Sequence, residues 1–251
     1  MCDRRVIAQL GMLETKQLEG KVALITGASR GIGRGIAEAF VKEGASIVAV
    51  ARNQQKLNAA ADELRSLGAV LPVPADITVE SQVVTMFERA MQRFGRVDIL
   101  VNNAGIYEES PIDQTPLETW QRTIDADLTG PFLCTREAMK IMKRQGGGRI
   151  INIGSISAQM PRPNAASYNC AKIGLVALTK TTALEGRDFH VVASCVHPGN
   201  VATDQMAGST EPAMAVDDVV KTVLTVATLP LNVNLLETVV FPIAQPYLGR
   251  G

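Results

Sequence analysis

Short apolar runs alternate along this chain with longer segments in which apolar residues recur at helical spacing. The runs predicted as strands are residues 22–25, 47–50, 70–73, 99–101, 150–153, 191–196 and 238–241. The segments predicted as helices are residues 33–43, 54–67, 79–94, 116–144, 167–184 and 216–229. The strand runs are continuously apolar, which indicates burial on both faces. We therefore expect a doubly wound parallel sheet of about seven strands, with helices on both faces, as one domain over residues 18–251.

Residues with known helix-end preferences bound several of these segments. Gly44 and Gly68 are expected to stop the first two helices. Thr78 is expected to cap the third helix. The stretch Thr115–Glu118 predicts a capping box, with proline at the first helical position, that opens the long fourth helix.

Composition narrows the class of protein. Hydrophobic residues make up 46% and charged residues 20%, and the 25 basic side chains balance 25 acidic ones, so no nucleic acid is expected as a partner. The 4 cysteines and 2 histidines show no disulfide or metal spacing, which favours a reducing cytoplasm and no metal. No apolar stretch reaches the roughly 18 residues of a membrane span, so no membrane is expected. Residues 1–17 are expected to form a flexible leader.

A glycine-rich turn follows the first predicted strand and opens the first predicted helix. Gly27, Gly31 and Gly33 remove side chains that would block a close approach of the backbone or the packing of the helix. A diphosphate placed there would lie on the positive end of the helix. The turn therefore predicts a dinucleotide site, although three glycines alone would also fit a flexible loop.

The end of the second strand indicates which dinucleotide is used. A carboxylate there would bind the adenosine ribose and repel a 2′-phosphate. This chain has Arg52 instead, and Arg30 in the glycine turn adds a second guanidinium suited to phosphate. We expect NADP(H) to be preferred, with NAD(H) possible. The alternative is that both arginines are solvated loop residues.

Tyr168 and Lys172 are four residues apart, so a helix would place them on one face. A phenol normally titrates near about 10, and an adjacent ammonium favours its ionised form. Such a tyrosine can exchange a proton near neutral pH. Ser155 lies upstream as a possible hydrogen-bond donor to the same substrate oxygen. The alternatives are a packing role for the tyrosine ring and a loop-capping role for the serine hydroxyl.

Together these features resemble the short-chain dehydrogenase/reductase family over residues 18–245. The matching motifs are the glycine turn 26–33, Asn102-Asn103-Ala104-Gly105, Ser155, the Tyr168–Lys172 pair, and the segment from Pro198 to Thr203. The resemblance implies a Rossmann-type fold, a nicotinamide cofactor and a homo-oligomer, either a tetramer or a dimer. It implies Ser155, Tyr168 and Lys172 as catalytic residues.

The resemblance also implies which residues bind the cofactor. Asp76 should lie near the adenine, and Val201 and Thr203 should border the carboxamide. The full set is Gly27, Ser29, Arg30, Gly31, Ile32, Gly33, Arg52, Asp76, Asn103, Ala104, Gly105, Tyr168, Lys172, Pro198, Gly199, Val201 and Thr203.

One position departs from the family. Asp127 stands where the family usually has an asparagine that helps to hold a water beside the lysine. A carboxylate there could stabilise the Lys172 ammonium and weaken its effect on Tyr168, or it could be nearly silent. We expect a working proton relay that includes Asp127.

The expected activity is hydride transfer between nicotinamide and a carbonyl or secondary alcohol carbon. Reduction of a small or medium ketone or aldehyde, with the 3-oxoacyl type as one candidate, is the first hypothesis. The alternatives are oxidation of a sugar, polyol or cyclic alcohol, and a non-catalytic dinucleotide sensor. The segments 106–111, 157–164 and 204–215 should wall an open pocket for an apolar carbonyl compound.

Overall fold

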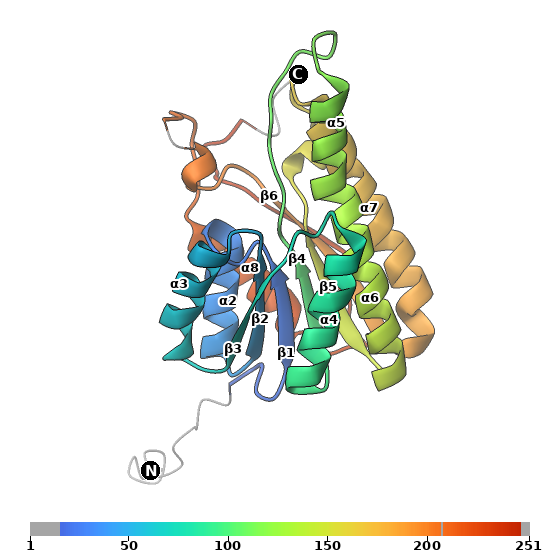
Figure 1. Ribbon diagram of the computed structural model, residues 1–251. Helices are drawn as coiled ribbons and strands as arrows, with labels where there is room; N and C mark the ends of the chain where they lie inside the picture. Colours follow the sequence, from blue (N-terminus) through green and yellow to red (C-terminus); the bar gives the residue numbers. More distant parts are fainter. Residues whose placement is uncertain (1–15, 207, 247–251) are drawn as a thin grey trace, which may run out of the picture.

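The computed structural model describes residues 16–206 and 208–246. Its sheet contains seven parallel strands in the order β3-β2-β1-β4-β5-β6-β7 (Figure 1). The strands are β1 (Val22–Thr26), β2 (Ser46–Ala51), β3 (Val70–Pro74), β4 (Ile99–Asn102), β5 (Gly148–Ile153), β6 (Val191–Pro198) and β7 (Glu237–Val240). The predicted parallel, doubly wound sheet of about seven strands is confirmed.

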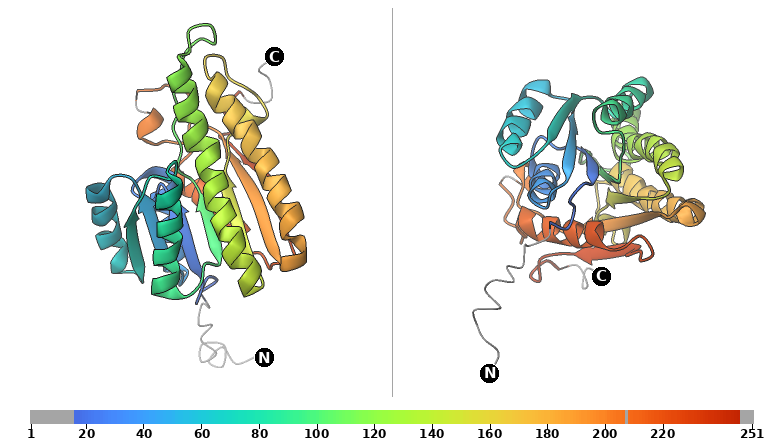
Figure 2. Two further views of the ribbon diagram at one scale, coloured as in Figure 1. Left: turned by 45° about the vertical axis from the view of Figure 1, so that its right-hand side comes forward. Right: turned by 90° about the horizontal axis from the view of Figure 1, so that it is seen from below.

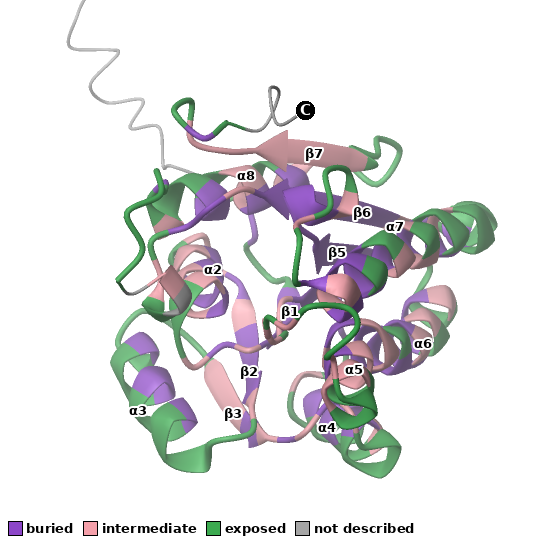
Figure 3. Ribbon diagram, turned by 90° about the horizontal axis from the view of Figure 1, so that it is seen from above, coloured by how far each residue is buried: buried purple, intermediate pink, exposed green. Residues whose placement is uncertain are grey.

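Helices cover both faces of the sheet. They are α2 (Gly31–Lys42), α3 (Gln54–Arg65), α4 (Glu80–Phe94), α5 (Leu117–Ile124), α6 (Gly130–Gln145), α7 (Ala166–Gly186) and α8 (Val216–Thr228). Helices α2, α3 and α8 lie on one face, and α4, α6 and α7 lie on the other (Figure 3). Successive strand residues point to opposite faces of the sheet and pack into the hydrophobic core on each face. Ile25 packs with α2 and α8, whereas Leu24 packs with α4 and α6. This two-sided burial is the reason that the strand sequences are continuously apolar.

The strand order reverses beside β1, which pairs with β2 on one side and β4 on the other. At such a switch point the loops after the strands diverge and leave a crevice outside their carboxyl ends. The glycine turn follows β1 and the Asn103–Gly105 segment follows β4. Ser155 follows β5, so three motifs that are far apart in sequence meet at one edge of the sheet.

Two of the predicted helix starts are wrong. Val79 precedes α4 as its N-cap, and the Thr78 hydroxyl instead donates to Asp76 Oδ1 at 2.8 Å. Pro116 is the N-cap of α5, and the Thr115 hydroxyl donates backwards to the Pro111 carbonyl at 2.9 Å. In both cases the threonine hydroxyl bonds to the preceding loop, so it does not accept from the first turn of the helix.

The long fourth helix is present but is not uniform. A π-helical turn, Asp125–Thr129, separates α5 from α6, and the Gly130 amide donates to the Asp125 carbonyl five residues earlier. Pro131 has no N–H to donate to the carbonyl of Asp127, its partner in a regular α-helix. The wider π-helical turn accommodates the absence of this hydrogen bond. This turn carries Asp127 and directs it towards the carboxyl edge of the sheet.

Three short 3₁₀ turns were not expected: Ile156–Ala158, Arg187–Phe189 and Asp204–Met206. The predicted leader, residues 1–17, lies outside the described residues except for Lys16 and Gln17. The Gln17 amide donates to a Glu43 carboxylate oxygen at 3.0 Å, and Leu18 is buried.

Helices α6 and α7 run side by side on the outside of the sheet (Figure 2). None of the helices in the described part of the chain has both the length and the hydropathy needed to cross a membrane.

Candidate functional site

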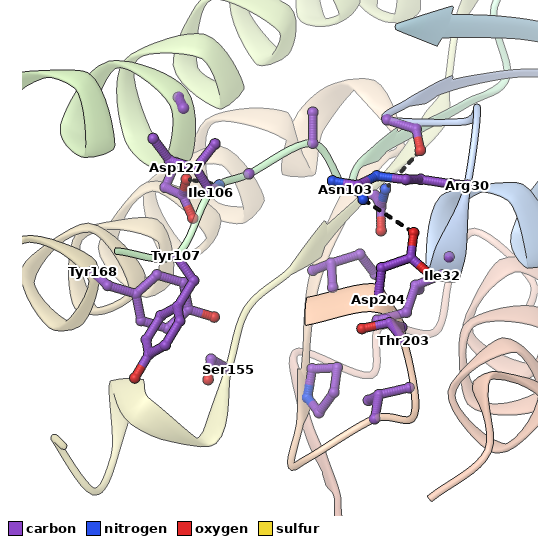
Figure 4. Close-up of a pocket in the computed structure, with 18 of the residues that line it drawn as sticks. Arg30, Ile32, Asn103, Ile106, Tyr107, Asp127, Ser155, Tyr168, Thr203 and Asp204 are labelled. Atoms are coloured by element: carbon purple, nitrogen blue, oxygen red, sulfur yellow. Dashed lines mark hydrogen bonds and ion pairs between the residues drawn. The ribbon is translucent and has the colours of Figure 1, made fainter. Parts of the chain in front are cut away.

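A cavity of about 530 Å³ lies at the carboxyl edge of the sheet (Figure 4). Its lining includes almost all of the residues predicted from the sequence. These are Gly27, Ser29, Arg30, Gly31, Ile32, Arg52, Asp76, Asn103, Ala104, Gly105, Asp127, Ser155, Tyr168, Lys172, Pro198, Gly199, Val201 and Thr203. Gly33 does not line the cavity. The fold therefore gathers motifs that lie between Gly27 and Thr203 in the sequence around one space.

The glycine turn leaves the start of α2 open towards the cavity. Gly27 and Gly31 have φ values of +69° and +55°, which are strained for residues with a side chain. A Cβ on Gly27 would lie 2.7 Å from Asn103 Nδ2, and one on Gly33 would lie 2.5 Å from the Gly27 carbonyl oxygen. Within the described residues no side chain caps α2 and no acidic residue lies in its first turn. The open amide groups and the positive end of the helix fit a diphosphate.

The segment after β4 is clamped to this turn. The Thr26 hydroxyl accepts from the backbone amides of Asn103 and Ala104, both at 3.0 Å. Asn103 Nδ2 donates to the Thr26 carbonyl at 2.9 Å. These bonds tie the ends of β1 and β4 together, so the glycine turn and the Asn103–Gly105 wall keep a fixed relative position.

A buried amide network, which the sequence analysis missed, fixes the next wall. Asn102 Nδ2 donates to Asn152 Oδ1, and Asn152 Nδ2 donates to the Thr179 hydroxyl, both at 2.8 Å. The three residues belong to β4, β5 and α7. The network therefore sets the position of α7, which carries Tyr168 and Lys172, relative to the strand that leads to Ser155.

Tyr168 and Lys172 share one face of α7, as the spacing predicts. Lys172 Nζ lies 5.3 Å from the centroid of the Tyr168 ring and donates to the Ile153 carbonyl at 3.1 Å. Ser155 directs its side chain towards the same region (Figure 4). The Ser155 hydroxyl accepts from the Ser157 amide at 3.1 Å. Because the oxygen is the acceptor in this bond, its proton is available to a substrate.

A second tyrosine packs against the first. The Tyr107 ring meets the Tyr168 ring edge to face, with centroids 5.0 Å apart (Figure 4). Burial, together with the hydrogen bond to Glu109, raises the pKa of Tyr107 to about 12. Tyr107 thus keeps its proton near neutral pH and serves as a packing partner for Tyr168.

Asp127 forms a buried ion pair with Lys172. Its Oδ2 lies 3.1 Å from Lys172 Nζ, and the two side chains are 0% and 7% exposed. Its Oδ1 accepts from the Ile106 amide at 2.7 Å. Burial is the largest single effect on the pKa of Lys172 and lowers it, but the charge and hydrogen bond of Asp127, together with Tyr168 and Cys195, raise it, and the net change is a rise. Burial raises the pKa of Asp127, against the opposing effects of Lys172 and the Ile106 amide.

His197 lies behind the strand end that carries Ser155. Its Nδ1 is 3.0 Å from the Ser155 carbonyl oxygen, and its Nε2 is 3.5 Å from a Glu237 carboxylate oxygen. Burial lowers the pKa of the imidazole. His197 does not line the cavity, so its contacts position the backbone of Ser155 from outside.

The arginines predicted to select the dinucleotide lie at the opposite end of the cavity. Arg30 forms an ion pair with Asp204 at 3.1 Å, and Arg52 lies 4.0 Å from Asp76. Both guanidinium groups are largely exposed, and no carboxylate stands at the end of β2 itself. Among the described residues, no group of three or more potential ligands could hold a metal ion.

A polar group on the substrate side was also missed. Arg162 lines the cavity and donates to Asn200 Oδ1 at 2.6 Å. Asn200 Nδ2 in turn donates to a Glu211 carboxylate oxygen at 2.7 Å. This wall of the predicted pocket therefore carries polar groups, and the expectation of an apolar carbonyl substrate stays a prediction. The signal available in the sequence was Pro161-Arg162-Pro163, a cation held between two prolines in a predicted pocket wall.

Comparison with known proteins gives consistent matches. The family model for short chain dehydrogenases matches residues 21–213. The 3-oxoacyl-[acyl-carrier-protein] reductase of Synechocystis sp. is 40% identical over 192 residues, which cover 74% of this chain and 76% of that protein. A short-chain type dehydrogenase/reductase structure from Mycobacterium marinum matches with a TM-score of 0.87 at 31% identity, covering 94% of this chain and 99% of the other.

A further solved structure is a 7α-hydroxysteroid dehydrogenase in complex with NADH and 7-oxo glycochenodeoxycholic acid. It matches with a TM-score of 0.85 at 27% identity and covers 90% of this chain and 95% of that one. The fold and these matches define an oxidoreductase of alcohol and ketone groups that binds a nicotinamide dinucleotide. The chain belongs to the short-chain dehydrogenase/reductase family.

Proposed function

We propose that this protein is an NADP(H)-dependent reductase of a small or medium ketone or aldehyde. The observation that carries the proposal is that Ser155, Tyr168 and Lys172 line the same cavity as the open start of α2. When bound, the nicotinamide supplies or accepts the hydride. The residues that would hold the dinucleotide are those of the glycine turn, Asn103–Gly105 and the segment from Pro198 to Thr203.

Proton handling is assigned to the residues around Tyr168. In the reductive direction the Tyr168 hydroxyl donates its proton to the oxygen of the substrate carbonyl. The Ser155 hydroxyl donates a hydrogen bond to the same oxygen and stabilises the negative charge that develops on it. Lys172 places a positive charge 5.3 Å from the centroid of the Tyr168 ring. Asp127 holds that ammonium in place and maintains its charge.

The preference for NADP(H) is supported by the charges at the far end of the cavity. Arg30, Arg52 and Lys56 all line that end, and the end of β2 lacks the carboxylate that would repel a 2′-phosphate. The ion pairs with Asp204 and Asp76 are solvent-exposed, so a phosphate can displace either carboxylate at a small energetic cost. Comparison of KM for NADPH and NADH tests the assignment, and a lower KM for NADH would refute it.

We also propose a homo-oligomer, either a tetramer or a dimer, in the cytoplasm. Exposed apolar side chains on α6 and α7 support association, among them Phe132, Ile173 and Leu184 at 45%, 47% and 64% exposure. The cysteines Cys134, Cys170 and Cys195 are free, which is consistent with a reducing compartment. Light scattering during size-exclusion chromatography measures the oligomeric state.

One assay separates the proposed reductase from the alternatives. A broad panel of carbonyl compounds and alcohols is tested in both directions with both cofactors, and NADPH binding is measured by calorimetry. Reduction that depends on NADPH supports the proposal. Turnover confined to sugars, polyols or cyclic alcohols in the oxidative direction would favour a dehydrogenase. Tight NADPH binding without any turnover would favour a sensor.

A further inference from the structure

We propose that Arg162, supported by Asn200, binds a carboxylate group of the substrate, so that the enzyme acts on oxo acids or hydroxy acids. This inference rests on the proposed function and names the substrate class for the same cavity. It is drawn from a carboxylate that this donor pair already contacts, from the stiffness of the segment that holds Arg162, and from its position beside the Tyr107–Tyr168 pair.

The protein itself places a carboxylate on this donor pair. A Glu211 oxygen accepts from Asn200 Nδ2 at 2.7 Å and lies 3.7 Å from Arg162 Nη2. Arg162 and Asn200 line the cavity, whereas Glu211 does not. Arg162 is thus a cation of the cavity lining, and Glu211, from outside that lining, offsets part of its charge. A guanidinium has five N–H donors in a planar fork, which leaves donors for a second carboxylate.

The segment that carries Arg162 is fixed relative to the catalytic helix. Asn169, the neighbour of Tyr168 on α7, accepts from the Arg162 amide at 3.3 Å and donates to the Arg162 carbonyl at 2.8 Å. Pro161 and Pro163 restrict the backbone on either side. Asn200 is anchored as well, because its amide donates to the Gln245 side chain at 2.9 Å. The distance between this donor pair and the Tyr168 hydroxyl is thus set by the fold.

The surroundings of Arg162 point to the substrate end of the cavity. Its charge acts on the Tyr107 hydroxyl, where it opposes part of the rise in the pKa of that phenol. Tyr107 packs on Tyr168, so the guanidinium lies on the side of the cavity that holds the proton donor. The other cations in the described lining are placed differently. Lys172 pairs with Asp127, and Arg30, Arg52 and Lys56 lie around the glycine turn and the end of β2.

Matched acids and esters test the assignment. Pyruvate, acetoacetate and levulinate place the carbonyl at increasing distances from the carboxylate, and each is compared with its methyl ester under NADPH. For the acid whose spacing fits, kcat/KM should exceed that of its ester by about 10-fold or more. Equal use of acid and ester across the series would overturn the proposal.

Site-directed variants test whether Arg162 and Glu211 determine the preference for the acid over its ester. Arg162→Gln should reduce the acid-to-ester ratio by about 10- to 100-fold, mainly through KM. Arg162→Lys should retain part of the ratio, because a point charge replaces the fork. Glu211→Gln should raise the ratio several-fold, because a competing carboxylate is lost. Lys221→Gln removes an exposed charge on α8 and serves as the control, with no change in the ratio.

Binding of an unreactive acid keeps this test independent of turnover. Valerate is levulinate without its carbonyl, and its affinity for the wild type and the variants is measured by calorimetry against methyl valerate. Valerate binding that weakens about 10-fold or more in Arg162→Gln or Arg162→Lys supports the anion site, even if no carbonyl compound is reduced. Binding that is equal for valerate and its ester, or that is insensitive to Arg162 and Glu211, would refute the site.

Discussion

Ion pairs occur at both ends of the cavity, and they differ in burial far more than in distance. At the Lys172 end, Lys172 and Asp127 are 3.1 Å apart and their side chains are 7% and 0% exposed. At the Arg30 end, Arg30 and Asp204 are also 3.1 Å apart, but their side chains are 61% and 79% exposed. Water and salt screen the exposed pair, whereas the buried pair has little access to either.

This difference separates two tasks. Exposed pairs contribute about 0–1 kcal/mol to stability, so their arginines can exchange a carboxylate for a cofactor phosphate. Removing one partner of a buried pair leaves an uncompensated charge and costs about 3–5 kcal/mol. The end that we assign to proton transfer is therefore rigid and charge-balanced. The end that we assign to cofactor selection is solvated and exchangeable.

The largest effect is expected at the buried end, on turnover. Tyr168→Phe keeps the ring and its contact with Tyr107 but removes the hydroxyl that donates the proton. We expect kcat to fall by about 10²- to 10⁴-fold, the range for loss of a general acid, while KM for NADPH changes little. Steady-state kinetics with the best substrate of the panel measures the effect. Near-normal turnover in this variant would end the catalytic proposal.

The next effect is on stability. Asp127→Leu leaves the Lys172 ammonium without its counter-charge and frees the Ile106 amide, so the free energy of unfolding should fall by about 3–5 kcal/mol. Urea denaturation monitored by circular dichroism measures the loss. Leu128→Ala, the next residue in the same π-helical turn, is the control for a change that leaves the charges intact. A loss below about 1 kcal/mol in Asp127→Leu would show that the pair is not a structural constraint.

Asp127→Asn removes the negative charge of the Asp127–Lys172 ion pair but keeps a side chain of nearly the same size and shape. In the wild type, Asp127 raises the pKa of Lys172 above its ordinary 10.5, so the stability from this charge is present below 10.5 and is lost as pH rises through the higher folded-state value. Burial lowers the pKa of Lys172, and without the Asp127 carboxylate less opposes this effect, so the pKa should fall. The alkaline limb of the kcat profile, and the alkaline loss of stability, should both move to lower pH. Unchanged profiles would show that Asp127 does not tune the site.

A smaller effect is expected at the exposed end, on cofactor choice. Arg30→Gln or Arg52→Gln should each raise KM for NADPH by about 10-fold, the loss of one charge-assisted contact to the 2′-phosphate, and should leave KM for NADH nearly unchanged. The rise in KM for NADPH should become smaller as salt is added, because both guanidinium groups are exposed and salt screens their charges. A parallel rise for both cofactors would mean that the arginines do not read the phosphate.

The smallest effect is expected for the exposed ion pair itself. Asp204→Asn should change the free energy of unfolding by less than about 1 kcal/mol, since both side chains face solvent. Chemical denaturation at low and high salt measures it. A loss as large as that of Asp127→Leu would contradict the distinction between the two ends.

Local patterns in the sequence determined the elements and the motifs. Apolar periodicity predicted the parallel sheet and its helices, because burial on both faces leaves a continuous apolar run within each strand. The glycine turn and the Tyr168–Lys172 pair could be recognised from the sequence because the residues of each motif lie within a short stretch of the chain. Where side chains decide helix ends, as at Thr78 and Thr115, the local pattern was misleading, since the hydroxyls bond to loop groups that precede them.

Contacts between distant segments were decided only by the tertiary structure. Pro131 removes one helical bond, and the wider turn that results brings Asp127 to Lys172 on a different helix. Arg162 lies in the connection between β5 and α7, whereas Asn200 and Glu211 lie in the connection between β6 and α8. The two connections meet because β5 and β6 are neighbours in the sheet. The burial that gives the Asp127–Lys172 pair its strength has no counterpart in a local window of sequence, because it depends on what the rest of the chain packs around the pair.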